Sequence, residues 1–381
     1  MTAFRIQRYL LKEIAAPMFM ALVIFTFVLM MGRSQKLMEM VIDKGVPIGQ
    51  ILHLLVNLLP AFLVLTIPVA LLIGVLLAFG RLSAESELVA MKASGIHLSL
   101  LMRPVLALAL FASLLTAALT LYIEPAANAA FRRQAFAIAS SIATVGIQPM
   151  TFNDEFNGLI LYAADVDDKN GQMSNIFIAD ERPGTLPATI FARTGGIQID
   201  QNDQSLNLRL KDGAIHRLDD HNDAYQIIQF DTYGLRVNLN HSNDNGQIVN
   251  RKESELTFPD LLIARQTPQN PKEARVLAAG LHKRFVMAST PIIFILIGVP
   301  LGIRSQRSGR GANFALALFI FLLFYILFTL SKTLVIDLGL TALFMWLPVV
   351  VFTVAGLFLL RAAANEREIH FDLIGFFRGK D

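Results

Sequence analysis

Six long apolar runs that lack Asp, Glu, Lys and Arg stand out along the chain, three before a polar middle region and three after it. They cover residues 14–32, about 58–80, 104–123, 285–303, 311–331 and 338–360. A helix needs about 20 mostly apolar residues to cross the roughly 30 Å of hydrocarbon in a membrane. We therefore predict an α-helical membrane protein with six transmembrane helices in a 3 + 3 arrangement.

The charge-free stretch around the second span, residues 45–80, is too long for one crossing. In its first part Gln50, His53 and Asn57 fall on one helical face, and Pro60 closes the segment. This pattern is typical of a helix that lies at the membrane interface. A kinked extension of the second span fits the pattern as well.

Residues 129–270 change to short alternating segments separated by Gly, Asp and Asn, which is the pattern of β-strands. LNLRL (206–210) alternates strictly, and Asp212-Gly213 before AIHRL (214–218) is typical of a hairpin turn. We therefore predict an all-β domain inserted between the third and fourth spans, built as a sandwich or an open barrel. From residue 259 to 284 the helical period returns and predicts a connection to the fourth span, with Arg275, Lys283 and Arg284 as anchors near the outer membrane surface.

Composition supports the membrane reading, because 54% of the residues are hydrophobic and only 17% are charged. Lys and Arg then indicate the orientation of the spans in the membrane, since these residues concentrate in the short connections on the cytoplasmic side. With a cytoplasmic N-terminus, the inner segments hold thirteen basic residues and the two short outer connections hold four. We expect both termini inside and residues 124–284 outside, and the absence of cysteine excludes disulfides and thiol catalysis.

Several functions are disfavoured by what the sequence lacks. It contains no GxxxxGK[ST] phosphate-binding pattern, and no predicted span contains an Asp, Glu, Lys, Arg or His to carry protons. Residues 124–284 hold sixteen basic and twenty acidic side chains, which argues against a nucleic-acid surface. We therefore expect a non-enzymatic subunit without a cofactor or metal, driven by a separate partner that binds any ATP and magnesium.

A short polar helix between the second and third spans could receive such a partner. Ser83 is a suitable N-cap, Glu85 and Glu87 favour the first turns, and Gly95 suits the C′ position, so the pattern predicts a helix over about 84–94.

Two apolar side chains on this helix, Leu88 and Met91, share one side and lie beside Glu87. Such a knob with a carboxylate could enter a groove of a soluble subunit. The same residues would also suit a stiff loop without a partner.

The segment ESELVAMKASG (85–95) resembles the coupling helix of the lipopolysaccharide export permease family LptF/LptG, where an ESExxxMxASG pattern occurs. RYLLKE (8–13) and LHKRF (281–285) extend the resemblance over nearly the whole chain. FIADERPG (177–184) and TIFARTG (189–195) look more like the LptF branch.

This resemblance implies a permease subunit of an ATP-binding-cassette exporter in the bacterial inner membrane, with both termini cytoplasmic and a periplasmic β-jellyroll at residues 129–270. Residues 1–128 would hold the first three spans and residues 271–381 the last three with a cytoplasmic tail. The implied partners are a paralogous LptG, an LptB ATPase dimer, LptC and through it LptA, and lipopolysaccharide. An alternative is a mechanotransmitting subunit that drives an external process and carries no lipid.

Residues for two contacts follow from the resemblance. Glu87, with Glu85, Leu88 and Met91, would couple to the ATPase. Arg33 and Lys36, just beyond the first span, would hold the phosphates or sugar acids of lipopolysaccharide, and attraction of an anionic headgroup by cations supports this expectation. Anchoring at the membrane interface is the alternative role for this pair.

Overall fold

The computed structural model describes residues 2–42, 46–145, 149–156, 158–167, 172–181, 187–200, 205–219, 224–238, 253–268, 270–304 and 310–364. They group into two compact units. A helical unit draws on residues 1–37, 55–128 and 253–381, and a second unit draws on residues 38–54 and 129–252. Each unit is described by itself.

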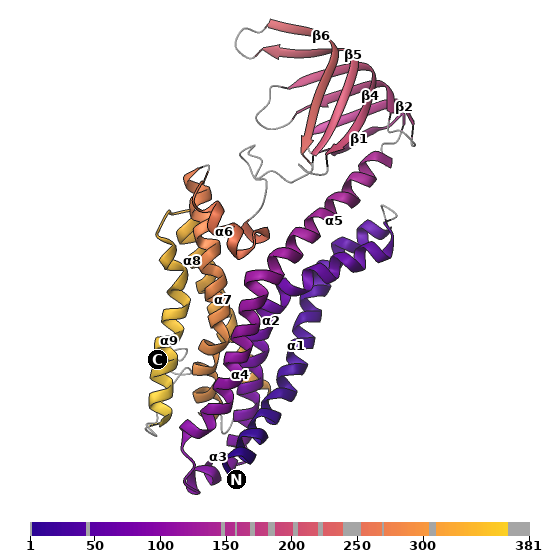
Figure 1. Ribbon diagram of the computed structural model, residues 1–381. Helices are drawn as coiled ribbons and strands as arrows, with labels where there is room; N and C mark the ends of the chain where they lie inside the picture. Colours follow the sequence, from indigo (N-terminus) through magenta and orange to yellow (C-terminus); the bar gives the residue numbers. More distant parts are fainter. Residues whose placement is uncertain are drawn as a thin grey trace, which may run out of the picture. The chain divides into compact units, whose positions relative to one another are not determined.

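The helices are numbered in chain order in Figure 1. The α-helices are α1 (Thr2–Ile42), α2 (Ile48–Ala84), α3 (Glu87–Ala93), α4 (Leu98–Ala118), α5 (Glu124–Val145), α6 (Phe258–Ala264), α7 (Pro271–Arg304), α8 (Arg310–Ile336) and α9 (Leu347–Ala364). A π-helix, η1 (Leu119–Ile123), joins α4 to α5, and two short 3₁₀-helices are η2 (Glu253–Glu255) and η3 (Ala342–Trp346).

The described residues contain six helical stretches that are long and apolar enough to cross a membrane, as the sequence predicts. They are Phe4–Arg33, Ile48–Ala84, Leu98–Ile138, Pro271–Ile303, Gly311–Ile336 and Ala342–Ala363. The second stretch is one continuous helix that includes Pro60 and Pro68. The residues before the second span therefore belong to the same helix as that span, as the alternative of an extended span predicts.

Helices α2 and α7 form the centre of the helical unit. In the most apolar part of each, 78% and 67% of the residues are buried, against 11% in α1. Glycines allow the central helices to approach closely, because a Cβ at Gly302 would lie 2.8 Å from the Cβ of Phe79. Helix α7 also packs against α4 and α9, so it contacts both halves of the bundle. The exposed apolar side chains of α1, α8 and α9 suit a lipid environment.

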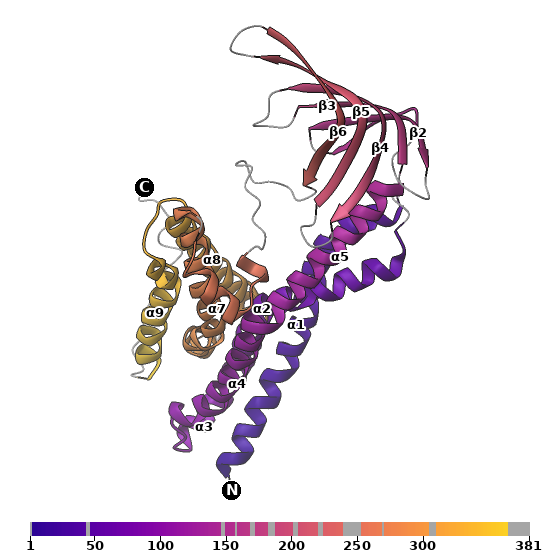
Figure 2. The ribbon, with the colours of Figure 1, turned by 45° about the horizontal axis from the view of Figure 1, so that its top comes forward.

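The β unit, drawn in Figure 2, is one antiparallel sheet. Its six strands follow each other in chain order. The strands are β1 (Phe152–Phe156), β2 (Leu159–Asp167), β3 (Gln172–Asp180), β4 (Ala188–Asp200), β5 (Ser205–Asp219) and β6 (Ala224–Asn238). The predicted all-β insert is confirmed. Its topology among the described strands is a meander, whereas a strict jellyroll has Greek-key connections.

The hairpin predicted at Asp212-Gly213 is wrong, because both residues lie inside the continuous strand β5. Asp212 has a φ of 52°, and cross-strand pairing passes over it, joining Lys211 to Thr232 and Gly213 to Phe230. The glycine is needed here for space, since a Cβ at Gly213 would clash with the carbonyl oxygen of Phe191. The dipeptide therefore marks a bend within a strand.

This bend continues across the sheet. We call the row of residues that pairing passes over in strands β2 to β6 the crease, and it consists of Ala164, Asn175, Arg193, Asp212 and Asp231. Asn175, like Asp212, has a positive φ, at 48°.

The side-chain alternation changes phase at the crease. On β3 both Met173 and Ile176 are buried although they are three residues apart, so one hydrophobic face continues on both sides of the row. Each strand thus carries one additional residue at the crease. Without this residue the apolar side chains beyond the crease would point outward.

The chain after the β unit differs from the predicted domain boundary at residue 270. Residues 253–268 group with the helical unit, where η2 and α6 lead into α7. Arg284 of α7, predicted to be a surface anchor, is only 5% exposed, and its Nη2 donates to the carbonyl oxygens of Leu256 and Glu253. It therefore fixes the returning chain to α7.

Candidate functional site

The predicted coupling helix is shorter than its sequence signals indicate. Helix α3 begins at Glu87, because residues 85 and 86 form a turn in which Ser86 has a φ of 59°. Ser83 is not its N-cap, since it lies in the last turn of α2 and its Oγ donates to the carbonyl oxygen of Ile303 at 2.7 Å. The residue that would have capped α3 therefore joins α2 to the end of α7.

The end of α3 agrees with the prediction. Gly95 has a φ of +82°, and its N–H donates to the carbonyl oxygen of Lys92 at 3.0 Å. The N–H of Ile96 donates to the carbonyl oxygen of Met91 at 3.1 Å. These two bonds form a Schellman motif, for which glycine is favoured at the left-handed position.

Burial reverses part of the predicted contact surface of α3. Leu88 is 3% exposed and packs into the core of the helical unit, and Met91 is partly buried against the same core. Leu88 is therefore not a knob for a partner but holds the helix in place. Val89 is the large apolar side chain that α3 exposes, at 53%, and the side chain of Glu85 is half exposed.

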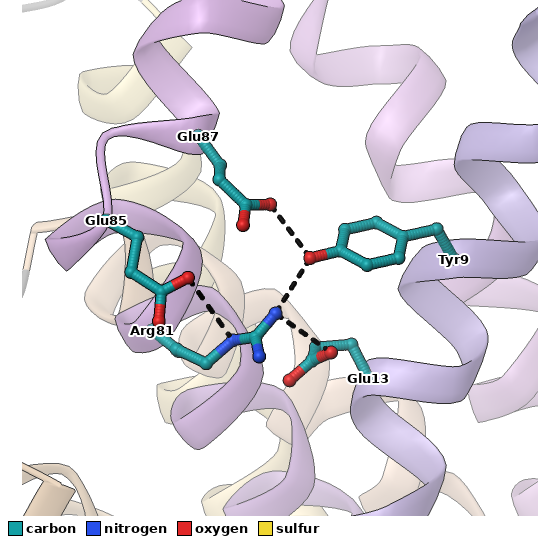
Figure 3. Close-up of polar contacts among 5 residues, drawn as sticks. All are labelled: Tyr9, Glu13, Arg81, Glu85 and Glu87. Carbon is teal, nitrogen blue, oxygen red and sulfur yellow. Dashed lines mark hydrogen bonds and ion pairs between the residues drawn. The ribbon is translucent and has the colours of Figure 1, made fainter.

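Glu87 is partly buried and belongs to a polar network that Figure 3 shows in full. The hydroxyl of Tyr9 on α1 donates to Glu87 Oε2 at 2.8 Å, and Arg81 Nη2 on α2 donates to the Tyr9 hydroxyl at 2.7 Å. The same Nη2 lies 3.0 Å from Glu13 Oε2, and Arg81 Nε lies 3.9 Å from Glu85 Oε2. We call these five residues the Arg81 network, and it ties the beginning of α1 to the turn before α3.

The Arg81 network carries one guanidinium and three carboxylates. Within these five residues two negative charges remain unbalanced at neutral pH. The side chains of Arg81 and Glu13 are 31% and 24% exposed, so solvent partly screens their attraction. A positively charged partner would complement these carboxylates.

The structure does not bring the two predicted sets of site residues together. Arg33 lies on α1, 24 residues after Tyr9, which is roughly 36 Å along the helix. Its side chain is exposed. Lys36 lies on the same helix, and its side chain is outside the described part of the chain.

Sequence reasoning missed Tyr9, Glu13, Arg81 and Val89 as members of the site. The spacing of Tyr9 and Glu13 places both on one face of α1, and Arg81 precedes Glu85 by four residues, as in helical ion pairs. These signals are local. The contact between Tyr9 and Glu87 spans 78 residues, which no local pattern indicates.

Comparison with known proteins adds independent evidence. The family model described as "Lipopolysaccharide export system permease LptF/LptG" matches residues 8–362. This range includes the β unit and all six candidate spans, except for the first residues of the first span and the last residue of the sixth. The lipopolysaccharide export system permease protein LptF of Escherichia coli K12 is 25% identical over 337 residues, or 86% of each chain.

The LptF protein of Shigella flexneri shows the same identity and coverage. An uncharacterized protein of Rickettsia prowazekii is 25% identical over 283 residues, which cover 74% of the present chain and 76% of that protein. Because the family model covers nearly the whole chain, with both helical halves and the β insert, the chain belongs to the LptF/LptG family of lipopolysaccharide export system permeases.

Proposed function

We propose that the chain is the membrane permease subunit of an ATP-driven lipopolysaccharide exporter. It extracts lipopolysaccharide from the inner membrane and passes it by way of the β unit toward the outer membrane. The observation that supports this proposal most is the family match over residues 8–362. ATP hydrolysis belongs to a separate subunit, so the chain itself is not an enzyme.

The proposed assembly contains a paralogous LptG subunit, an LptB ATPase dimer, and LptC leading to LptA. The excess of Lys and Arg in one set of connections supports cytoplasmic termini and a periplasmic β unit. In this orientation α3 and the Arg81 network face the cytoplasm. The unbalanced carboxylates there would attract a basic surface of the ATPase, with Glu87 and Glu85 as the charged contacts and Val89 as an exposed apolar contact.

The proposed cargo contacts are Arg33 and Lys36. Arg33 ends the candidate span Phe4–Arg33 and Lys36 follows it, which supports a position at the opposite membrane surface from the Arg81 network. Lipopolysaccharide is anionic at its head, and a cation at the outer leaflet attracts it electrostatically. The exposure of Arg33 supports such a contact.

A reconstituted assembly tests the proposal. The chain, its paralogue and the ATPase are placed in lipid nanodiscs, and ATP hydrolysis is measured with and without lipopolysaccharide. Transfer of lipopolysaccharide to added LptA is measured in parallel, with LptC present. We expect lipopolysaccharide to stimulate hydrolysis, and the double variant Arg33→Ala, Lys36→Ala to lose most of this stimulation at an unchanged basal rate.

The matched control is Lys332→Ala, which removes a charge near the end of α8. Hydrolysis that drives no transfer would contradict the permease role and favour the mechanotransmitting alternative. Equal stimulation in the double variant and the control would remove Arg33 and Lys36 from the cargo site.

A further inference from the structure

The Tyr9 hydroxyl lies between a cation and an anion, which fixes the direction of its hydrogen bonds. The Arg81 guanidinium has only donors, and the Glu87 carboxylate has only acceptors when it is ionised. The hydroxyl oxygen therefore accepts from Arg81 Nη2, and its single hydrogen is directed to Glu87 Oε2. The three groups form an ordered relay, shown in Figure 3.

The local structure of α3 supplies little else to orient the Glu87 side chain. Glu87 is the first residue of the helix, and its N-cap Ser86 makes no side-chain hydrogen bond to the helix. A free glutamate side chain loses rotamer entropy when it is fixed. An orienting contact made before docking removes part of this cost from the docking step.

Tyr9 is suited to supply that contact. It packs against the core of the helical unit, and a tyrosine side chain has only two rotatable torsions before its hydroxyl group. The bond to Tyr9 uses Oε2 of Glu87, and an ionised carboxylate has about four acceptor positions on its two oxygens. A cation of a docked subunit can therefore bind Glu87 while the bond to Tyr9 is kept.

We propose that Tyr9 is a positioning residue for the ATPase: its hydroxyl, oriented by Arg81, holds the Glu87 carboxylate in the position that receives a cation of the docked subunit. The proposal rests on the proposed function and deepens it, because it names the group through which the beginning of α1 takes part in docking. The residue acts through Glu87 and does not itself touch the ATPase.

A double-mutant cycle on docking affinity tests this role. The chain with its paralogue in nanodiscs is titrated with the purified ATPase, using the wild type, Tyr9→Phe, Glu87→Ala and the double variant. Tyr9→Phe keeps the ring and removes the hydroxyl. We expect it to weaken docking about 3-fold to 10-fold with Glu87 present and less than about 2-fold with Glu87→Ala, as for the loss of one hydrogen bond to a charged group.

The Glu87→Ala background distinguishes an effect of Tyr9 that acts through Glu87 from a general effect on helix packing. If Tyr9 merely packed α1 against its neighbours, its replacement would weaken docking equally with and without Glu87, and the proposal would fail. Unchanged docking in Tyr9→Phe with a clear loss in Glu87→Ala would also overturn it, while leaving the proposed function in place. Unchanged docking in Glu87→Ala would instead contradict the coupling role of Glu87 in the proposed function.

Two further variants guard against a trivial loss of folding. Tyr122→Phe removes the hydroxyl of an exposed tyrosine on η1 and should leave docking unchanged. Arg81→Gln removes the guanidinium that orients the Tyr9 hydroxyl, and its effect on docking should also shrink in the Glu87→Ala background. An Arg81→Gln effect of equal size in both backgrounds would argue against the relay even if Tyr9→Phe did not fold.

Discussion

Two arginines of the helical unit, Arg81 and Arg284, use the same guanidinium chemistry in opposite ways. Ser83, beside Arg81, bonds to Ile303 of α7, and Arg284 precedes Ile303 by 19 residues, or about 28 Å along the helix. The two arginines thus belong to opposite ends of the membrane-spanning bundle. Arg284 is almost fully buried, whereas the side chain of Arg81 is 31% exposed.

Their partners explain what the difference means. Arg284 donates to the backbone carbonyl oxygens of Glu253 and Leu256, which cannot leave without moving the chain. Arg81 contacts the side chains of Tyr9, Glu13 and Glu85, which can change rotamer and exchange partners. A buried arginine on backbone acceptors makes a fixed joint, and a half-exposed arginine on side chains makes a contact that docking can modify.

The largest expected effect comes from breaking the fixed joint. Arg284→Met leaves the carbonyl oxygens of Glu253 and Leu256 without this donor, and we expect the free energy of unfolding to fall by about 3 kcal/mol. Thermal unfolding in detergent measures the change. Arg103→Met, at an exposed arginine of α4, is the control and should stay within about 0.5 kcal/mol of the wild type.

Reversing a charge in the modifiable contact should affect binding more than stability. Glu87→Arg places a cation where the partner surface is expected to be basic, so we expect the affinity for the ATPase to fall about 100-fold. Its unfolding temperature should fall by less than that of Arg284→Met, because the variant loses only the partly buried hydrogen bond from Tyr9 and gains a screened repulsion from Arg81. Co-purification with the ATPase at the wild-type level would count against this prediction.

Salt concentration should affect the contacts of Arg81 and those of Arg284 differently, and by smaller amounts than the substitutions above. Raising the salt concentration from 50 to 300 mM screens the exposed carboxylates of the Arg81 network, and we expect docking to weaken several-fold. The stability difference between Arg284→Met and the wild type should be nearly independent of salt, because buried groups are screened little. Salt-independent docking would contradict the electrostatic role of the network.

The smallest effect is expected from the turn before α3. Ser86 adopts a φ of 59°, which is strained for a residue with a Cβ. Ser86→Gly removes this strain but also increases the conformational entropy of the unfolded chain. We therefore expect the free energy of unfolding to rise by about 0.5 kcal/mol. Hydrogen exchange of the α3 amides should slow about 2-fold, and faster exchange would show that the serine stabilises the turn.

The features predictable from the sequence are those that the surroundings impose on many residues at once. Hydrocarbon requires long apolar helices, so the six spans could be found from the absence of charge alone. The alternation of apolar and polar residues likewise predicts the strands of the β insert. At α3, however, Ser83 has the residue type of an N-cap but bonds to Ile303, 220 positions away. Leu88 faces inward for a similar reason, because the core it joins comes from other helices.

The candidate site was predictable only as far as its local pattern reached. Glu85 and Glu87 lie in one short segment and share a recognisable motif. Tyr9 reaches them only because α1 packs beside α2. The same packing brings Thr26 Oγ1 of α1 to 3.1 Å from Thr66 Oγ1 of α2. Asp212-Gly213 shows the same limit in the sheet, since a dipeptide does not reveal whether its neighbours continue a strand.

The crease constrains how the β unit can change in length. Every strand from β2 to β6 carries its extra residue in the same transverse row, so the row is a property of the whole sheet. Deleting Asn175 alone would turn the apolar residues of β3 on one side of the row to the wrong face, while its neighbours kept theirs. We therefore expect a change of this residue in one strand to require the same change in the other four, and single insertions or deletions to be tolerated better in the connecting loops than at the crease.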